Sequence, residues 1–475
     1  MLKPRSARLA RNSQMKLLLA TLFLTASSLL ADEAPYPGRV WKTVTPEEGG
    51  WSGALLRIAW AYAEQLQVAN VLIVQDGVIV GQFGAIAQPR PINGVRTSLL
   101  NGLYGIAVKN KQIDTNRTLA SLKIDDSPDP LTDTEKQAKI SDLLQCRSGV
   151  YHPAALELPT MRATRPARGS HPPGSFFFIS NWDFDVLGTI YNQATHNDIF
   201  TDFDRLIAKP LGFQDFVVSR DAKYTQGKVS THPFFSFQLS ARDLARFALL
   251  YLRHGVWSGN LTIVPSAWID LSTVTVSGPT ELELRGTYGY LWWTAGTNGD
   301  LIPFINCGQT AFASFGRGGN YLLVLPEYKL VVVCQDNGSD SSAPEITPAQ
   351  FGRLLQLAFA AKTSAPDPVP STKGANPKVT ESSQSLLRAA IAGQVDETLF
   401  EPEMAKRFTD SIALKRLRAL YSEKEGPTTR IELYKFVSRK NRSIYYFSLF
   451  QGTRALAIAL VVDEQNKIAG FASVE

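Results

Sequence analysis

The sequence predicts a mixed α/β (α+β) protein built from two folded domains. Three observations support this. Strand-like and helix-like segments alternate up to residue 361, a Pro-, Ser- and Thr-rich stretch follows at 362–384, and residues 385–475 contain helix patterns followed by strand patterns. A chain of 475 residues is also longer than one hydrophobic core usually serves.

The N-terminal segment is typical of a secretory signal. Five basic residues and no acidic ones precede Ala31, and an apolar run extends from Leu17 to about Leu24. We therefore expect residues 1–31 to be a signal peptide, with Met15 as an alternative start, and the protein to be exported to the periplasm or the extracellular space. The run is too short to span a bilayer, so no stable membrane span is expected after the signal is removed.

The net charge of +6 belongs largely to this leader. Without its five basic residues the net charge falls to +1, so nothing in the charge balance points to a nucleic-acid partner.

The first domain contains three segments with clear structural patterns. Residues 70–84 contain two apolar, strand-like runs separated by an Asp-Gly pair at 76–77, which predicts a β-hairpin. Residues 240–255 predict an amphipathic helix that begins after Ser240 and ends at Gly255. Residues 319–335 predict two buried strands around a Pro-Glu turn.

The stretch "NGVRTSLLNGLYGIAV" (93–108) predicts another helix. Val95, Leu99, Leu103 and Ile106 are spaced as one apolar stripe, and Asn93 is placed to cap the helix. Its first turn contains Gly94, a residue that weakens a helix by about 1 kcal/mol relative to Ala.

The segment at 362–384 is poor in large apolar residues and predicts a linker. After it, residues 385–475 predict a small α+β domain in which helices precede a four-stranded antiparallel sheet.

The three cysteines are too few and too widely spaced for a disulfide framework or a zinc site. Two alternatives stay open for Cys307 and Cys334, which either pair in an exported protein or remain buried as free thiols. The five histidines show no metal-ligand spacing, and no glycine-rich phosphate loop is present. We expect neither a metal nor a cofactor.

The order of several short segments is informative. A hairpin and a helix ending "GIAVKNKQID" precede "LLQCRSGVYHP", "HPPGSFFFISNWDFDVLG", "SARDLARF", "YGYLWW" and "GGNYLLVLPEYKLVVV". This order resembles the β-lactamase-related serine hydrolases, the family of class C β-lactamases, D-alanyl-D-alanine carboxypeptidases and related esterases. The resemblance implies, for residues 40–361, a β-lactamase/penicillin-binding-protein-like sandwich of an antiparallel sheet with helices, plus a helical region.

The resemblance also implies where the catalytic residues should stand. Such enzymes use a Ser-x-x-Lys pair on one helical face, a Tyr-x-Asn loop, and a strand carrying Lys or His before Thr or Ser and Gly. In the family the nucleophile stands eleven residues before the Gly of "GIA", which is Gly105 here, so the nucleophile and its Lys partner correspond to Gly94 and Thr97. In the same way the Tyr and Asn of the second motif correspond to Ile179 and Asn181. The third motif should lie in "TAFASF" (310–315), which contains no such triple.

Our hypothesis is therefore a pseudoenzyme that keeps the cleft and has lost acyl transfer, because glycine, threonine and isoleucine cannot supply a nucleophile, a base and a proton relay. One alternative is an active hydrolase with rearranged residues, using Ser98 with Asn101 three residues on. Another is an adaptor that acts through its C-terminal domain.

Several residues are candidates for binding in the cleft. A small-molecule or peptide/peptidoglycan-type ligand would be held there, with an anionic ligand favoured if arginines gather around it. The sequence identifies neither a protein partner nor an oligomeric state. The binding candidates are Asn101, His152, His171, Asn181 and Arg317, and the further arginines are Arg147, Arg165 and Arg168.

Overall fold

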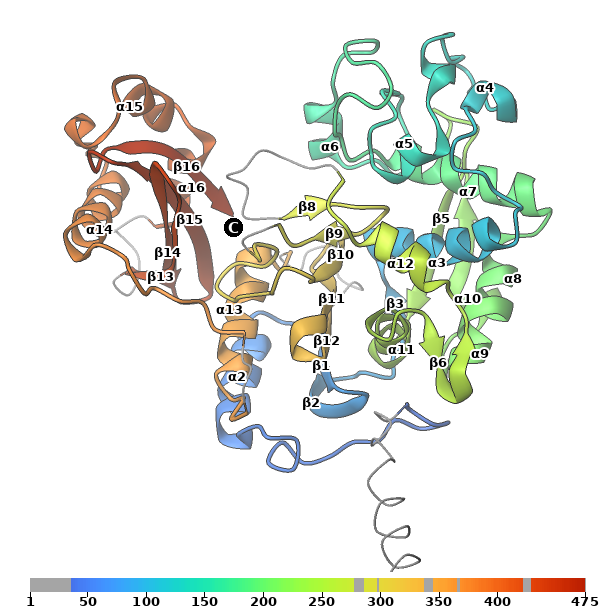
Figure 1. Ribbon diagram of the computed structural model, residues 1–475, viewed down its shortest axis with the longest axis horizontal. Helices are drawn as coiled ribbons and strands as arrows, with labels where there is room; N and C mark the ends of the chain where they lie inside the picture. The colour runs from blue at the N-terminus through green and yellow to red at the C-terminus, as the bar shows by residue number, and fades with distance from the viewer. Residues whose placement is uncertain are drawn as a thin grey trace, which may run out of the picture. The chain divides into compact units, whose positions relative to one another are not determined.

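A seven-stranded antiparallel sheet forms the centre of the first domain (Figure 1). Its order is β2 (Val78–Gly84), β1 (Asn70–Gln75), β12 (Leu330–Gln335), β11 (Asn320–Leu325), β10 (Phe312–Gly316), β9 (Trp293–Thr294) and β8 (Thr287–Tyr288). The predicted hairpin is confirmed, because β1 and β2 pair around Asp76 and Gly77, whose φ angles of 48° and 86° are those of a tight hairpin turn.

The computed structural model describes residues 36–276, 286–296, 299–336, 345–364, 368–421 and 429–474, without the side chains of Arg416 and Leu420. The segment expected to be a signal peptide, 1–31, lies outside these residues. In the described ranges, no helix has both the length and the apolar character needed to cross a membrane.

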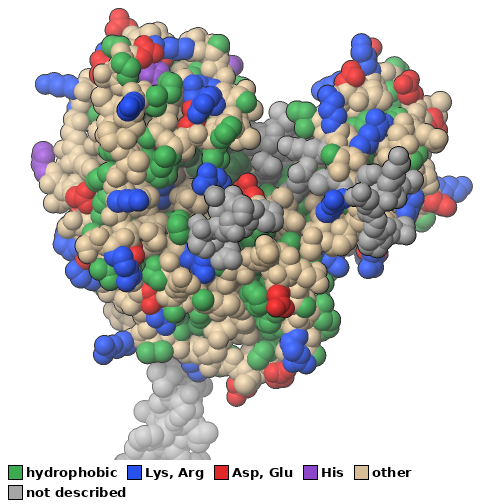
Figure 2. Space-filling model, turned by 180° about the vertical axis from the view of Figure 1, so that it is seen from behind, with side chains coloured by type: hydrophobic (Ala, Val, Ile, Leu, Met, Phe, Trp, Pro, Cys, Tyr) green, Lys and Arg blue, Asp and Glu red, His purple; other side chains and the backbone are tan. Residues whose placement is uncertain are grey.

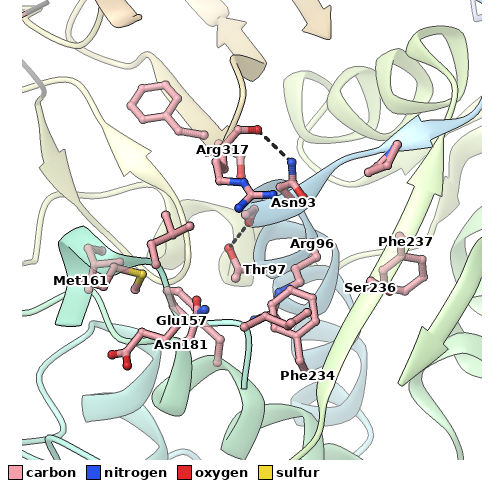
Figure 3. A pocket seen from close by; sticks show the side chains of 18 of the residues that line it. Asn93, Arg96, Thr97, Glu157, Met161, Asn181, Phe234, Ser236, Phe237 and Arg317 are labelled. Carbon is pink, nitrogen blue, oxygen red and sulfur yellow. Dashed lines mark hydrogen bonds between the residues drawn. The ribbon is translucent and has the colours of Figure 1, made fainter. Parts of the chain in front are cut away.

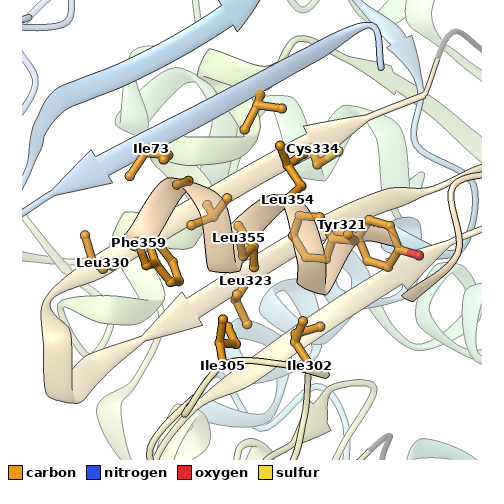
Figure 4. Close-up of a cluster of buried hydrophobic side chains, with 14 of the residues drawn as sticks. Ile73, Ile302, Ile305, Tyr321, Leu323, Leu330, Cys334, Leu354, Leu355 and Phe359 are labelled. Carbon is orange, nitrogen blue, oxygen red and sulfur yellow. The ribbon is translucent and has the colours of Figure 1, made fainter. Parts of the chain in front are cut away.

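Both faces of the central strands are buried, as the continuous apolar run of β12 requires. Leu330, Val332 and Cys334 point to one face, where they pack with α2 (Gly53–Gln65) and α13 (Pro348–Phe359) in the core shown in Figure 4. The opposite face is covered by α11 (Ala241–Leu252).

Helix α11 confirms the predicted boundaries closely. The Ser240 side chain accepts a hydrogen bond from the backbone N–H of Asp243, and Gly255 has a φ of 80°. A Cβ at residue 255 would lie 1.8 Å from the carbonyl oxygen of Val264, so this turn needs glycine for its space as well as its φ.

The helical region lies beside the sheet and contains a second, three-stranded sheet in the order β3–β5–β4. Its elements are β3 (Arg90–Pro91), η1 (Asn93–Val95), α3 (Arg96–Lys109), α4 (Leu119–Leu122), η2 (Glu135–Gln137), α5 (Ile140–Leu144), α6 (Pro159–Thr164), α7 (Asn181–Thr195), α8 (Ile199–Phe203), η3 (Asp204–Ala208), α9 (Lys209–Leu211), α10 (Val218–Asp221), β4 (Ala222–Thr225) and β5 (Phe234–Leu239). Short elements follow α11, namely β6 (Val256–Trp257), η4 (Ser258–Asn260), β7 (Leu261–Thr262) and α12 (Ser266–Ser272).

The helix predicted at 93–108 differs from expectation in two respects. Asn93 is not its cap, since this residue has a φ of 49° and lies in a 3-10 turn, and its side chain instead donates to the carbonyl oxygen of Arg317. Helix α3 is also buried along almost its whole length, from Arg96 to Ala107, and not on one stripe. It crosses the middle of the domain, where neighbours cover every side.

The C-terminal domain has the predicted α+β order. Helices α14 (Pro377–Ile391), α15 (Pro402–Thr409) and α16 (Ile412–Leu420) precede the sequential meander β13 (Arg430–Ser438), β14 (Arg442–Gln451), β15 (Arg454–Asp463) and β16 (Ile468–Val474). The predicted linker, 362–384, extends too far, because α14 begins at Pro377 with Asn376 as its cap. The few apolar residues of this segment suffice, since Val379, Leu386 and Leu387 fall on one buried face.

The sheet of this domain is buried on both faces. One face packs on the three helices, and the other carries a row of small residues that packs with Phe304 and Ala349 of the first domain. Beside this contact, Asp300 accepts hydrogen bonds from the Lys435 ammonium at 2.7 Å and the Tyr446 hydroxyl at 3.0 Å. Residues 37–475 thus form one compact unit.

Two sequence expectations concern cysteines and charge. Cys146, Cys307 and Cys334 are all buried and free, so Cys307 and Cys334 do not pair.

On the face seen in Figure 2, Lys and Arg side chains are interspersed with Asp and Glu.

Candidate functional site

A pocket of about 640 Å³ opens where the start of α3 meets α6, α7, the β4–β5 hairpin and β10 (Figure 3). Its size is within the range usual for small-molecule sites. Its lining includes Asn93, Gly94, Arg96, Thr97, Leu156, Glu157, Leu158, Met161, Ile179, Asn181, Phe184, Lys223, Thr225, Phe234, Ser236, Gln238, Tyr288, Leu291, Trp293, Ser314, Phe315 and Arg317.

Gly94 lies where the backbone of η1 meets the backbone of β10. A Cβ on Gly94 would stand 2.4 Å from the carbonyl oxygen of Phe315, and a Cβ on Gly316 would stand 2.4 Å from the carbonyl oxygen of Ile92. Carbon and oxygen atoms do not approach this closely without a bond. The two glycines therefore permit a backbone contact that any side chain at residue 94 would disrupt.

The other two degenerate positions also line the pocket. The Thr97 hydroxyl lies one turn beyond Gly94 and donates to the carbonyl oxygen of Gly94 at 3.1 Å. Ile179 precedes Ser180, which caps α7, and Asn181 is the first residue of that helix. The structure thus brings Gly94, Thr97, Ile179 and Asn181 to one pocket, as their matched motif positions require.

Ser98 and Asn101 lie outside the pocket. The Ser98 hydroxyl is fully buried and donates to the carbonyl oxygen of Leu291 at 2.8 Å. The Asn101 amide donates to Ser272 and to the carbonyl oxygen of Tyr290, and it accepts from the Tyr251 hydroxyl at 2.6 Å. Both side chains hold α3 to its neighbours.

The two candidate histidines do not line the pocket either. His152 is 2% exposed, with Nδ1 3.3 Å from a carboxylate oxygen of Asp126 and Nε2 3.7 Å from one of Glu135. His171 stacks on Phe176 with ring centroids 4.0 Å apart. The His152 ring thus contacts the Asp126 carboxylate and does not face the pocket.

The candidate arginines do not gather. Arg317 lines the pocket, whereas Arg147 does not. Arg168 pairs with Asp129 and Glu135, and Arg165 pairs with Glu157 at the pocket rim. These ion pairs neutralise the charges that were expected to face a ligand.

The sequence reading missed a buried ion pair in the pocket wall. Arg96 donates from Nη2 to Asp185 Oδ1 at 2.9 Å, both side chains are 1% exposed, and the guanidinium lies 3.8 Å from the ring centroid of Phe234. Burial raises the pKa of Asp185 to about 7, although the guanidinium of Arg96 opposes the rise. From sequence alone, an arginine in the first turn of a helix is normally expected to be exposed. The one sequence signal for a buried partner was Asp185, a charged residue within the largely apolar segment "DFDVLG".

A thiol and a phenol beside the pocket, those of Cys146 and Tyr288, are not activated. Burial raises the pKa of Cys146 well above its ordinary value, so its thiol stays protonated at neutral pH. The pKa of Tyr288, which lines the pocket, is raised in the same way. Neither group is available as an anion.

A protein-family model described as Beta-lactamase matches residues 106–355, which is 250 of the 475 residues. The chain belongs to the beta-lactamase family. The match confirms the resemblance and covers the helical region from the last turn of α3 onward, β10–β12 and most of α13. Gly94 and Thr97 precede the matched segment, so their correspondence to the catalytic pair rests on the spacing to Gly105 and on their place in the pocket.

This chain is also similar to several solved structures. A Bacillus anthracis protein named "Putative 6-aminohexanoate-dimer hydrolase" has 17% identity and a TM-score of 0.51, over 70% of this chain and 91% of its own. The octameric penicillin-binding protein homologue from Pyrococcus abyssi has 15% identity and a TM-score of 0.47, over 89% of this chain and 99% of its own. A beta-lactamase from Mycobacterium bovis has 16% identity and a TM-score of 0.45, over 64% of this chain and 100% of its own. Among curated protein sequences, none matches this chain.

The beta-lactamase family member described here thus has the family fold. At identities below 20%, the solved structures speak for the fold alone.

Proposed function

We propose that this protein is an exported pseudoenzyme of the serine-hydrolase type, which binds a ligand in its pocket without acyl transfer. The observation that carries the proposal is the position of the Phe315 carbonyl oxygen, 2.4 Å from where a Cβ of residue 94 would stand. A nucleophilic serine needs that Cβ, and the pocket wall occupies its place.

The residues around Gly94 support the same reading. Acyl transfer needs a nucleophile, a base to take its proton and a relay to the leaving group. Gly94 has no side chain, the Thr97 hydroxyl already donates a hydrogen bond to a backbone carbonyl, and Ile179 has no ionisable group.

The alternative of an active enzyme using Ser98 has little support. Its hydroxyl is fully buried and donates to the carbonyl oxygen of Leu291. The residue at i+3 is Asn101, whose side-chain amide is engaged in four hydrogen bonds. An amide is not a base at neutral pH. The adaptor alternative is weakened because the first domain already covers the second face of the C-terminal sheet.

Export is part of the proposal and rests on the basic start, short apolar run and small residues of 1–31. Expression of the full chain followed by cell fractionation tests it. We expect the mature protein outside the cytoplasm, with a mass that lacks the leader. A full-length protein that stays in the cytoplasm would refute export without touching the chemistry.

The chemistry is tested by intact-mass measurement after incubation with a fluorescent penicillin and, separately, a fluorophosphonate. We expect an unchanged mass with both probes and a folded protein by circular dichroism. Ser98→Ala is the matched control. A stoichiometric adduct on the parent chain that is lost in Ser98→Ala would establish the active-enzyme alternative, and an adduct on any other serine would equally overturn the proposal.

A further inference from the structure

The pocket has one wall whose polar groups the proposed loss of chemistry leaves unexplained. On the β4–β5 hairpin, alternate residues face the pocket, because Lys223 pairs with Ser236 and Thr225 with Phe234 across the two strands. Phe235 and Leu239, on the other face of β5, are fully buried. We call the pocket-facing residues Lys223, Thr225, Ser236 and Gln238 the hairpin face.

The hairpin face is rich in hydrogen-bond donors. The Ser236 hydroxyl donates to the carbonyl oxygen of Lys223 at 3.2 Å. In the described part of the chain, the side chains of Lys223, Thr225 and Gln238 have no hydrogen-bond or ion-pair partner. An ammonium, a hydroxyl and a primary amide together offer several N–H and O–H groups, and the face contains no carboxylate.

The charge of the pocket is positive once its ion pairs are discounted. Glu157 is paired with Arg165, and Arg96 with Asp185. Lys223 and Arg317 remain, and no acidic side chain of the described residues pairs with either. The positive charge and the free donors both favour an anionic group on the ligand.

The opposite wall is apolar. Helix α6 has no buried residue, yet its Met161 lines the pocket (Figure 3). The preceding Leu156 also lines the pocket and is 61% exposed. Phe184 and Trp293 add to the apolar lining. Apolar side chains this exposed around a concave site favour a ligand with an apolar body that would cover them.

We propose that the pocket binds an amphiphilic anion, with its anionic head on the hairpin face at Lys223 and an extended apolar chain between Leu156 and Met161. This proposal rests on the proposed function, since it takes the pocket to be a binding site. The head is assigned to Lys223 because this residue shares the hairpin face with the Thr225 hydroxyl and the Gln238 amide. A carboxylate and a phosphate monoester share the required chemistry.

The test is isothermal titration calorimetry on the mature full-length protein, with each ligand kept below its critical micelle concentration. The ligands are dodecanoate, dodecyl phosphate, dodecanol, dodecyltrimethylammonium and acetate. We expect the two long-chain anions to bind at least about tenfold more tightly than dodecanol, the cation or acetate, because only these anions combine a charge-assisted hydrogen bond to Lys223 with an apolar chain. The stronger of the two anions then identifies the head group.

Variants locate the head. Lys223→Gln should weaken dodecanoate binding about tenfold and leave dodecanol unchanged, whereas Lys109→Gln, an exposed lysine on the last turn of α3, should change neither. Equal affinity for dodecanoate and dodecanol, or an unchanged dodecanoate affinity in Lys223→Gln, overturns the proposal. So does a loss confined to Arg317→Gln.

The failure of this proposal and that of the proposed function are distinguishable. Intact mass after titration reports whether any ligand has been transferred to the protein. A covalent adduct refutes the pseudoenzyme and leaves the preference for anions standing, while an unchanged mass without anion preference refutes only the hairpin-face assignment.

Discussion

Gly94 and Phe315 are in backbone contact, at a separation that leaves no room for a Cβ between them. The Phe315 carbonyl oxygen would lie 2.4 Å from that atom, and Gly316, the next residue of β10, meets Ile92 equally closely. The end of β10 therefore packs on η1 in the space where, by the family resemblance, a nucleophile's side chain belongs. If the proposed function is right, loss of the nucleophile and closure of its site are one structural feature.

Gly94→Ala should be destabilising although alanine favours helices. The new Cβ forces β10 or η1 to move, which we expect to lower the free energy of unfolding by roughly 1–3 kcal/mol. Chemical denaturation measures this. Gly38→Ala is the control, because a Cβ there meets no atom within 4 Å, and it should change stability by less than about 0.5 kcal/mol. A neutral Gly94→Ala would contradict the close contact.

Restoring the expected residue types should not restore chemistry. The triple variant Gly94→Ser, Thr97→Lys and Ile179→Tyr carries every side chain that the family motifs require at these positions. We expect no adduct with a fluorescent penicillin, since the serine cannot be seated while Phe315 holds its place. Circular dichroism must first show a folded variant, and a penicillin adduct on residue 94 would prove that β10 yields.

Ser98→Ala should affect stability and not reactivity. The substitution leaves the buried carbonyl oxygen of Leu291 without its 2.8 Å hydrogen bond, which we expect to destabilise the fold by about 1–3 kcal/mol. Ser170→Ala, which removes an exposed hydrogen bond to His171, should change stability by less than about 0.5 kcal/mol. Equal effects of the two variants would argue against the buried role of Ser98.

The sequence alone predicts those parts of the fold that depend on a few neighbouring residues. The Asp76–Gly77 turn and the Ser240 cap were read correctly because turns and caps depend on a few neighbouring residues. Helix α14 begins at Pro377, earlier than the predicted start at residue 385, because Ser- and Thr-rich segments are typical of linkers. Only the packing against the C-terminal sheet shows that three apolar residues are enough to hold this helix in place.

The site was predictable only in part. Gly94, Thr97, Ile179 and Asn181, which were matched to motifs by spacing, line one pocket, and Arg317 is the one of the four candidate arginines that joins them there. The hairpin face was not foreseen, because its residues alternate on two short strands whose pairing no local signal fixes. His152 was misjudged because histidine in a loop beside proline gives no sign of a buried carboxylate partner far along the chain.

Asp300 should be important for docking the C-terminal sheet. Asp300→Ala removes an acceptor from Lys435 and from Tyr446, and we expect a loss of about 2 kcal/mol or more in the free energy of unfolding, since Lys435 is only 9% exposed. Tyr446→Phe removes the phenol bond alone and should cost about 1 kcal/mol. If the two variants lose the same amount, the ion pair contributes nothing to docking.

Asp185→Asn should be stabilising at neutral pH, against the usual expectation for a buried ion pair. The pKa of Asp185 is raised from 3.8 to about 7 on folding, so between these values the folded state binds more protons than the unfolded state, and stability falls as pH rises. Asparagine retains an oxygen for Arg96 and removes this dependence. Near pH 4 the two proteins should have similar free energies of unfolding. As the pH rises to 7, the variant should become more stable than the parent by about 1.4 kcal/mol per unit of pKa shift, and this difference in the free energy of unfolding should then stay constant. Denaturant titrations at several pH values measure the two free energies of unfolding.

If attraction between the two charges instead outweighs the cost of burying Asp185, the variant should be less stable than the parent at every pH above 4, because the buried guanidinium of Arg96 would have lost its counter-charge.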